Sequence, residues 1–576
     1  MKNILKPLGG LMAGLVLFAG CDDFLDTQDL THKNTDNFPQ TLADAQMALA
    51  GIYNNLGTAL GANGGHAPNS FLMVSELAAD DRLGGGGGGD QRLQATDMLL
   101  QFAIDEYDVF WQDRYAGINR ANTAIETLGN CEGFSSEEQK NKMLGEAYFL
   151  RAFFYYELAS LFERVPLHLN TIAEPLPQSD PDAIWGQIVA DLKQAIELMK
   201  PAGKTPSGEA GHADAYVAEV MMARAFLFYT GFYNKPDVTL PDGGKVTKAD
   251  VTAWITDCKD NSGYTLVPDY RNLWAYTNPY TVEEYGYTQG KSLQWVGNQG
   301  EAANTEAMFA IKFNKFADWS NRTGCANGYA VFTGLRGGEV GEDAFPMGGG
   351  WGAGPVATNL FNDWVSAAGG ETNDARLLAS ICKLRTELSA FPVGGGWNDW
   401  IQGTDFYSKK GGISGKDAGE YKMPFDKFMY SLDLQWDISY ISDLVLMRYA
   451  EVLLLHSELT ETADGINALR TRAGLAPVAY SLDALQKERR WELAFEGVRW
   501  NDIRRWGIAA DALDKQANVA IYIGGLSETN VAHGGGYKAR YEATRGFFPI
   551  PERQIELSKG IYTQNAGWNG NSYGSW

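Results

Sequence analysis

Groups that carry out chemistry are sparse in this sequence. Its 576 residues include five cysteines and six histidines, and no two cysteines form a C-x-x-C pair. A zinc site is therefore not expected. H-E-x-x-H and a Walker lysine motif are also absent, which removes two common signatures of metalloproteases and nucleotide-binding enzymes. An oxidising location would allow one or two disulfides among the cysteines after Cys21, but the sequence does not pair them.

Positive charge is in short supply too. The chain has 48 lysines and arginines against 71 aspartates and glutamates, which gives a formal charge of −23. A surface of this sign repels phosphate backbones, so nucleic-acid binding is not expected. It also disfavours binding to anionic lipid through charge alone.

The N-terminus has the pattern of an export signal. Lys2 and Lys6 precede the apolar run 8–18, which is too short to span a bilayer comfortably. The run ends in "LFAGC", which resembles a bacterial lipobox and implies cleavage before Cys21 and acylation of its thiol. Attached acyl chains can hold a soluble domain on a membrane without a spanning helix. The alternative is an ordinary signal followed by a core cysteine.

Glycine is abundant, with 66 residues, and six lie in one row within "DDRLGGGGGGDQR" at 80–92. The run formally matches G-x-G-x-x-G, but no strand precedes it and "DQRLQ" does not continue a dinucleotide fold. A phosphate loop is therefore discarded. A calcium site built from Asp80, Asp81 and Asp90 remains an alternative, because hard cations favour clustered carboxylates. A mobile, ligand-contacting rim is the other.

Hydrophobic periodicity divides the chain into three parts after the signal. Residues 21–233 contain successive amphipathic helices, for example the stripe Ile184, Ile188, Leu192 behind Asp180 as a cap and Pro181 in the first turn. Residues 234–440 lose this period and hold nine of the 16 tryptophans in turn-rich segments. Helical patterns return in 441–576. We therefore predict a mainly α protein, a scaffold of stacked helical hairpins with a large irregular insertion.

Three helices are predicted in the last part. The first covers 441–461 and is apolar nearly all round, the second covers 465–475 and ends at Gly474, and the third covers 485–507. On the third, Arg489, Glu492, Glu496 and Arg499 are spaced to share one face. Paired carboxylates can do acid–base chemistry. Because each has an arginine one turn away, which lowers carboxylate pKa values, we interpret the group as a structural ion network.

Aromatic residues in polar, flexible segments are the better functional clue. Flat rings beside Asp, Asn and Arg are suited to a sugar, whose C–H face stacks on the ring while its hydroxyls meet the polar groups. Several of these rings are flanked by glycine. The alternative for each ring is that it anchors a loop to the core. The predicted ligand-contacting set is Trp274, Tyr276, Trp295, Trp319, Trp351, Trp397 and Trp400.

Eight segments, in order from Cys21 to Trp568, resemble one family. They are "LFAGCDDFLD", "GEAYFLRAFFYYELASLFERVPL", "YTLVPDYRNLW", "NTEAMFAIKFN", "RYAEVLLLHSEL", "INALRTRAGL", "ERRWELAFEGVRWNDIRRWG" and "FFPIPERQIELSKGIYTQNAGW". Together they are similar to the SusD/RagB family of nutrient-uptake lipoproteins. The resemblance covers essentially the whole chain after the signal.

The resemblance implies a tetratricopeptide-like helical scaffold on the outer membrane, lipid-anchored and facing the cell exterior. It implies that the protein is a non-catalytic lid on a SusC-like, TonB-dependent β-barrel transporter, to which it delivers an oligosaccharide or, in some members, a peptide. No cofactor is implied, and the glycine run becomes a mobile loop whose Asp81, Arg82 and Asp90 adjust to the ligand. The remaining alternative is a glycan-cleaving enzyme using two carboxylates of the insertion.

Overall fold

The computed structural model describes residues 38–570 apart from 59, 61–66, 104, 206–210, 299–303, 317–325, 338–342 and 394–398. The predicted lipobox and Cys21 lie outside these residues. Helices dominate the described part, and its strands form only two-stranded sheets, so the prediction of a mainly α fold is confirmed. None of the described helices has both the length and the apolar character needed to cross a bilayer.

The N-terminal helices start at residues that satisfy free backbone N–H groups. Ser136 and Asp214 accept from the N–H groups of Gln139 and Val217, and Thr247 forms a capping box with Asp250. Pro181 stands in the first turn of its helix, as predicted. These helices are α1 (Leu42–Thr58), α2 (Phe71–Leu77), α3 (Gln91–Asp97), α4 (Asp108–Thr127), α5 (Glu137–Phe162), α6 (Pro181–Met199), α7 (Ala215–Phe232) and α8 (Lys248–Asn261).

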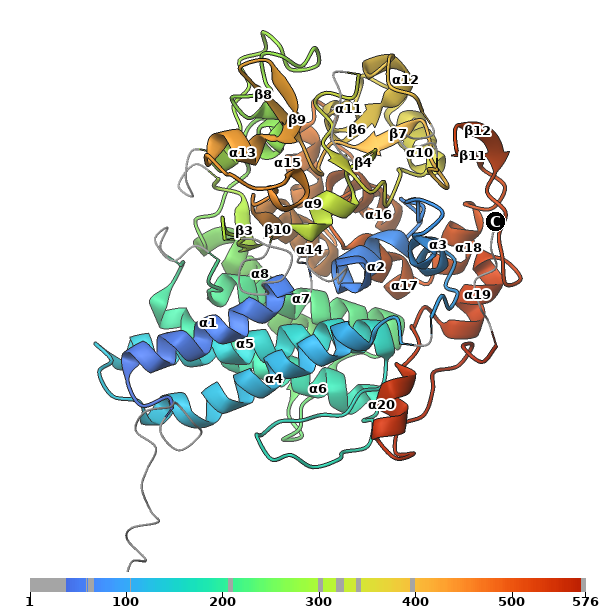
Figure 1. Cartoon of the computed structure of the whole chain (residues 1–576). Helices are drawn as coiled ribbons and strands as arrows, with labels where there is room; N and C mark the ends of the chain where they lie inside the picture. Colours follow the sequence, from blue (N-terminus) through green and yellow to red (C-terminus); the bar gives the residue numbers. More distant parts are fainter. Residues whose placement is uncertain are drawn as a thin grey trace, which may run out of the picture.

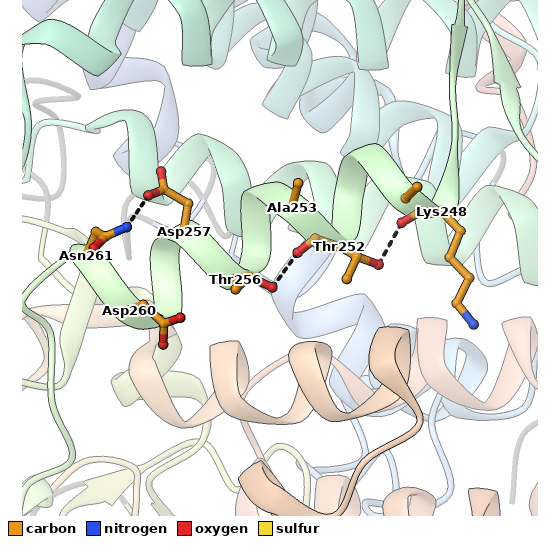
Figure 2. A pocket seen from close by; sticks show the side chains of 8 residues that line it. Lys248, Thr252, Ala253, Thr256, Asp257, Asp260 and Asn261 are labelled. Carbon is orange, nitrogen blue, oxygen red and sulfur yellow. Dashed lines mark hydrogen bonds between the residues drawn. The ribbon is translucent and has the colours of Figure 1, made fainter.

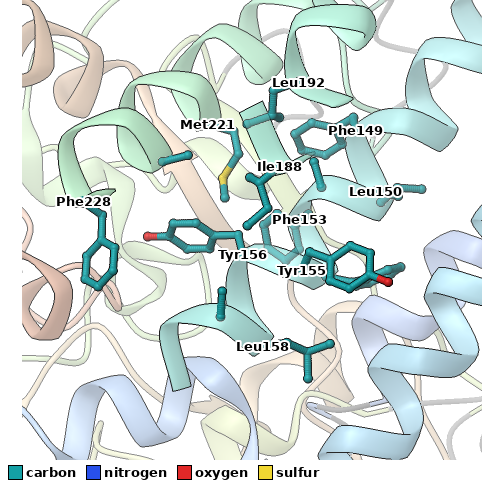
Figure 3. Close-up of a cluster of buried hydrophobic side chains, with 14 of the residues drawn as sticks. Phe149, Leu150, Phe153, Tyr155, Tyr156, Leu158, Ile188, Leu192, Met221 and Phe228 are labelled. Atoms are coloured by element: carbon teal, nitrogen blue, oxygen red, sulfur yellow. The ribbon is translucent and has the colours of Figure 1, made fainter. Parts of the chain in front are cut away.

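The core of this half is centred on α5, which is buried from Phe149 to Phe162 on all sides. Figure 3 shows its aromatic side chains meeting Ile188 and Leu192 of α6 and Met221 and Phe228 of α7. Burying a side chain of this size contributes about 1.5–3 kcal/mol. Helices α4 to α8 pack in sequence order, each against the next.

The middle of the chain is short-segmented, as predicted. Its described strands take part in five two-stranded sheets, of which four are antiparallel and one, β4–β5, is parallel. Its helices are α9 (Gly328–Phe332), α10 (Thr358–Ala368), α11 (Ala375–Ser380), α12 (Leu384–Glu387) and α13 (Phe425–Met429). Its strands are β1 (Val238–Thr239), β2 (Lys245–Val246), β3 (Ala307–Ile311), β4 (Leu335–Arg336), β5 (Gly349–Gly350), β6 (Ile381–Lys383), β7 (Phe406–Ser408), β8 (Ser414–Asp417) and β9 (Glu420–Pro424).

Two predicted helices of the C-terminal part differ in the structure. The segment predicted as one helix over 441–461 begins as strand β10 (Leu444–Arg448), which pairs with β3, and only then becomes α14 (Tyr449–Thr460). An apolar run that is buried on both sides suits strand and helix alike. The remaining elements are α15 (Asp464–Arg472), α16 (Leu482–Glu492), α17 (Arg499–Arg505), α18 (Ala509–Asp514), β11 (Ala520–Ile523), β12 (Leu526–Thr529), α19 (Tyr537–Thr544) and α20 (Glu552–Leu557).

The prediction of one helix over 485–507 is also wrong, because α16 stops at Glu492 and α17 starts at Arg499. Phe495 and Gly497 have φ of 67° and 77° in the turn between them. At Gly497 a Cβ would lie 2.4 Å from Leu72 Cδ1, so this position requires glycine. Gly474 has φ of 77° just after α15 and ends that helix as predicted.

Helices from the two ends of the chain pack together. Helix α14 lies against α8, and α17 lies against α7. Helix α8 lies inside the predicted middle segment 234–440, yet it continues the stack of α4 to α7. Figure 1 shows these long helices in the lower half, with the short strands and helices of the middle segment above them.

A central ion network ties these parts together; it consists of Glu306, Arg376, Arg448, Arg472 and Glu492, all nearly or fully buried. Arg448 Nη1 donates to Glu306 at 2.7 Å and to Glu492, and Arg376 Nη1 donates to Glu492 at 2.9 Å. Burial alone would raise the pKa of Glu492, but Arg472, Arg448 and Arg376 hold it well below its ordinary value. The prediction of a structural network is right, although its arginines come from other segments.

The outer two residues of the predicted face have separate partners. Arg489 donates to Asp502 at 2.8 Å, and Arg499 donates to Asp80 at 2.7 Å. Arg489 lies one turn from Glu492 within α16, as predicted, but the helix ends at Glu492, so Glu496 and Arg499 do not continue that face. Glu496 instead accepts from Arg448 at 2.6 Å and from Lys410 at 2.7 Å.

Candidate functional site

The glycine run is packed rather than mobile over its first four residues. Gly84 to Gly87 are buried, and only Gly88 and Gly89 are exposed. The backbone of this stretch bonds to 352–357 and 400–402, for example from Gly86 N–H to the Gly352 carbonyl at 2.8 Å and from Ile401 N–H to the Gly86 carbonyl at 2.8 Å. The run therefore joins an early segment to the middle of the chain.

Close approach explains why glycine is needed here. At Gly85, with φ of 68°, a Cβ would lie 2.4 Å from the Gly352 carbonyl oxygen. At Gly87 it would lie 1.9 Å from Arg336 Nη2. No such contact exists at Gly88 or Gly89, where nothing lies within 4 Å. A side chain at either of the first two positions would displace what the loop packs against.

The structure gives Asp80, Asp81 and Arg82 roles different from the predicted ones. All three are buried in ion pairs: Asp80 with Arg499, Asp81 with Arg490 at 2.7 Å, and Arg82 with Glu76 at 2.8 Å. Asp81 Oδ2 is buried without a hydrogen-bond partner. Because Asp81 and Arg82 are buried in these pairs, they are not placed to adjust to a ligand at the surface. Asp80 and Asp81 face guanidinium groups, which a calcium ion would have to displace.

Asp90, the last predicted residue of this loop, belongs to a small surface cluster around Arg336. We define the Arg336 cluster as Asp90, Arg336, Trp351 and Asp399. Arg336 donates through Nε and Nη2 to the two oxygens of Asp399, at 3.1 and 2.7 Å, and through Nη1 to Asp90 and to the Trp351 carbonyl, at 3.2 and 3.1 Å. The side chain of Arg336 is 9% exposed and that of Asp399 is 45% exposed. A buried guanidinium thus holds two carboxylates at the surface.

Trp351 belongs to this cluster through its backbone carbonyl, which accepts from Arg336. Its half-buried indole packs edge-on against Phe332, with ring centroids 4.5 Å apart. Arg336 and Asp399 were not predicted from the sequence. The signal for Asp399 was its position between Trp397 and Trp400 in "GGGWNDW"; Arg336 is flanked by glycine in "GLRGG" but has no motif of its own.

Two of the predicted aromatic residues are core residues. Tyr276 and Trp400 are fully buried. The Tyr276 hydroxyl donates to the Ala379 carbonyl at 3.0 Å, and Trp400 Nε1 donates to the Gly352 carbonyl at 3.2 Å. For both rings the alternative interpretation, that they anchor loops, describes the structure. Trp319 and Trp397 lie outside the described residues.

Trp274 and Trp295 line a different space, a cavity of about 570 Å³ between the helical scaffold and the middle segment. Lys410 Nζ lies 4.3 Å from the Trp274 ring centroid and donates to Glu496. Burial lowers the pKa of Lys410 to about 8, an effect that Glu496 partly offsets. Trp295 is 9% exposed and packs on Phe425. The structure therefore separates these two rings from the Arg336 cluster.

A further hollow runs along α8 (Figure 2) and is lined by that helix alone. Three of its polar side chains donate within the helix, Thr252 and Thr256 to the Lys248 and Thr252 carbonyls and Asn261 to Asp257. Lys248 pairs with Glu461 and Asp257 with Lys200. One helix face without an opposing wall offers little to a ligand. It carries no functional assignment.

Metal and disulfide expectations can be compared with the described residues. Nowhere among them do three His, Cys, Asp or Glu side chains gather in a way that could hold a metal ion. Cys131, Cys258 and Cys382 are free and buried. Cys325 lies outside the described residues.

Two family models match this chain over separate regions. The SusD family model matches residues 344–568, and a SusD-like model described as "Starch-binding associating with outer membrane" matches residues 23–227. The chain belongs to the SusD-like family. Residues 344–568 of this SusD-like chain include Trp351 and Asp399, and residues 23–227 include the glycine run and Asp90.

Two curated SusD-like relatives come from Formosa agariphila. SusD-like protein P2 is 25% identical over 96% of this chain and 98% of its own length. SusD-like protein P25 is 20% identical over 86% of this chain and 88% of its own length.

Solved structures share the SusD-like fold. A "Laminarin binding SusD-like protein" is 23% identical with a TM-score of 0.66, and covers 92% of this chain and all of its own. "Surface glycan-binding protein A" from Bacteroides fluxus is 22% identical with a TM-score of 0.69, over the same shares. The protein of that title from Bacteroides thetaiotaomicron, in complex with laminarihexaose, is 19% identical with a TM-score of 0.68, over 91% of this chain and all of its own.

Proposed function

We propose that this chain is a cell-surface lipoprotein that captures an oligosaccharide without cleaving it and delivers it to a SusC-like, TonB-dependent transporter. Family membership supports the general role, because one matching model is described as starch-binding and associated with the outer membrane, and similar structures are titled as laminarin- or glycan-binding. On this proposal Cys21 carries the lipid anchor and the folded residues act as the lid of the transporter.

The observation that carries glycan binding is the Arg336 cluster. Trp351 offers a half-buried indole face, and Asp90 and Asp399 offer carboxylate oxygens held at fixed positions by Arg336. Sugar rings have an apolar C–H face and a rim of hydroxyl donors. On this proposal the C–H face stacks on the Trp351 indole and hydroxyls donate to the two carboxylates. Because these side chains are already fixed, binding loses less side-chain conformational entropy.

The same geometry favours binding over cleavage. A glycosidase needs one carboxyl group that donates a proton to the leaving oxygen and a second that acts as base or nucleophile. Both oxygens of Asp399 accept hydrogen bonds from Arg336, which holds this carboxylate in place as an acceptor. The two carboxylates of the cluster bind the same guanidinium rather than facing each other across an open bond-cleavage site.

Calorimetry on protein lacking residues 1–21 tests the proposal. Laminarin and starch oligosaccharides are titrated first, followed by a wider glycan panel and a peptide panel. For a glycan that binds, Trp351→Ala is expected to weaken the affinity at least about 30-fold, or about 2 kcal/mol, as for a central aromatic contact.

Trp254→Ala is the matched control, because Trp254 is another half-buried tryptophan but lies on α8. It should lose some thermal stability and keep the wild-type affinity. Unchanged glycan affinity in Trp351→Ala would remove the cluster from the site. Binding to peptides and to no glycan would replace the proposed ligand, and shorter products after incubation would replace binding by catalysis.

A further inference from the structure

The Arg336 cluster contains a guanidinium whose Nε, Nη1 and Nη2 all donate to protein acceptors. Nε and Nη2 form the paired fork that binds a carboxylate or sulfate, and Asp399 takes up both. Nη1 donates to Asp90 and to the Trp351 carbonyl. A ligand anion could use this fork only by displacing Asp399.

The charge that a ligand meets is therefore negative. Asp399 is 45% exposed on its side chain, against 19% for Asp90 and 9% for Arg336, and the formal sum of these three groups is −1. Arg92 is the first basic residue after Asp90 in the sequence, and its guanidinium lies 5.8 Å from the Phe332 ring centroid. It also acts on Glu106: burial raises the pKa of that carboxyl and Arg92 opposes the rise. The whole chain adds a formal charge of −23.

We infer that the site selects uncharged glycans and rejects sulfated or uronate-bearing chains of the same backbone. This inference rests on the proposed function and names the class of ligand within it. Neutral sugar hydroxyls donate to the exposed oxygens of Asp399 and Asp90, which accept only. A sulfate or carboxylate at the same place would lie against Asp399 with no free guanidinium fork to bind it.

Matched ligands test the selectivity directly. Laminarin and starch oligosaccharides are compared with their sulfated derivatives by calorimetry at about 20 mM and about 200 mM salt. The neutral ligand should bind with the same affinity at both salt concentrations. At low salt its sulfated form should bind at least about tenfold more weakly than the neutral form. This difference in affinity should shrink at high salt, where charges are screened. Sulfated chains that bind as well as or better than neutral ones would overturn the inference and leave glycan binding intact. No binding to any glycan of the wider panel would instead count against the proposed function itself.

A pair of variants assigns the selectivity to the cluster. Asp399→Asn removes one negative charge and replaces one of the two oxygens that accept from Arg336. It should raise the ratio of the affinity for the sulfated ligand to that for the neutral ligand at least about fivefold. Asp182→Asn makes the same change in net charge on α6, where Asp182 pairs with Lys235, and should leave the ratio unchanged. Equal ratios in the two variants would show that Asp399 does not set the selectivity. Thermal melts confirm that both variants are folded.

Discussion

Alanine at Gly87 is the sharpest test of the link between the glycine run and the Arg336 cluster. Its Cβ would lie 1.9 Å from Arg336 Nη2 and 2.6 Å from Asp399 Oδ2. Ordinary van der Waals contact needs about 3.5 Å, so the guanidinium must retreat by roughly 1.5 Å. That shift breaks the 2.7 Å bond from Nη2 to Asp399 and strains the one to Asp90.

The structure sets the size of the expected effect. A hydrogen bond to a charged group contributes about 1.5–3 kcal/mol, and the partial exposure of Asp399 reduces this. We expect Gly87→Ala to lower the free energy of unfolding by about 1–3 kcal/mol and to weaken glycan binding, because Asp399 loses its fixed position. Gly88→Ala is the control. Gly88 has no neighbour within 4 Å and no positive φ, so alanine should be neutral or stabilise by up to about 1 kcal/mol.

Urea unfolding followed by circular dichroism gives the stability of both variants, and calorimetry gives their affinity for the glycan. Adjacent glycines with opposite outcomes would confirm that packing, rather than mobility, is what the run provides. If Gly87→Ala matches Gly88→Ala in both measurements, the described contact between the loop and Arg336 does not hold in solution.

Two further predictions concern buried carboxylates. Glu492→Gln leaves three arginines with one anion fewer and should lower the free energy of unfolding in urea by about 3–5 kcal/mol. The control Glu461→Gln changes an exposed pair with Lys248 and should leave the unfolding midpoint unchanged. Equal midpoints in the two variants would refute the stabilising role of the network. Because the pKa of Glu492 is depressed, its stabilisation is complete above the unfolded value near pH 4.3 and is lost as pH falls further, so wild type should lose more stability than Glu492→Gln on acidification. Burial raises the pKa of Asp97 to about 7, although Gln402 and Tyr537 donate to it. Its folded form keeps a proton that the unfolded form loses near pH 4, so stability falls by up to about 1.4 kcal/mol per pH unit between pH 4 and 7. Asp97→Asn should flatten this slope in unfolding curves, and an unchanged slope would assign it to another group.

The long helices could be predicted because their signals are local. The 3.6-residue period and the start at Asp180 and Pro181 lie within one segment and need no partner. The helix predicted over 441–461 failed at β10, since the pairing with β3 depends on residues more than a hundred positions earlier. The break after Glu492 contains left-handed backbone at Phe495, a residue type that seldom adopts it, so no local signal in the sequence predicts the break.

The site was only partly predictable for the same reason. Composition indicates aromatic and acidic residues suited to a sugar, and in the structure Asp90 and the Trp351 carbonyl share Arg336 as a donor. It cannot show that Trp400 is buried or that Asp81 pairs with Arg490. Arg336 went unpredicted because its importance comes from three partners in separate segments. A single arginine outside any motif does not show in the sequence which residues it will contact in the fold.

The ion pairs of Asp80 and Asp81 have a consequence for how the protein is made. Their arginines lie 419 and 409 residues further along the chain. A ribosome releases those aspartates long before it has translated Arg490 and Arg499, and an exported chain emerges in the same order. Until then Asp80 and Asp81 lack the guanidinium groups that they contact in the folded chain, so the burial of these two carboxylates has to wait for the C-terminal helices. Loss of the last hundred residues would leave both aspartates without these partners.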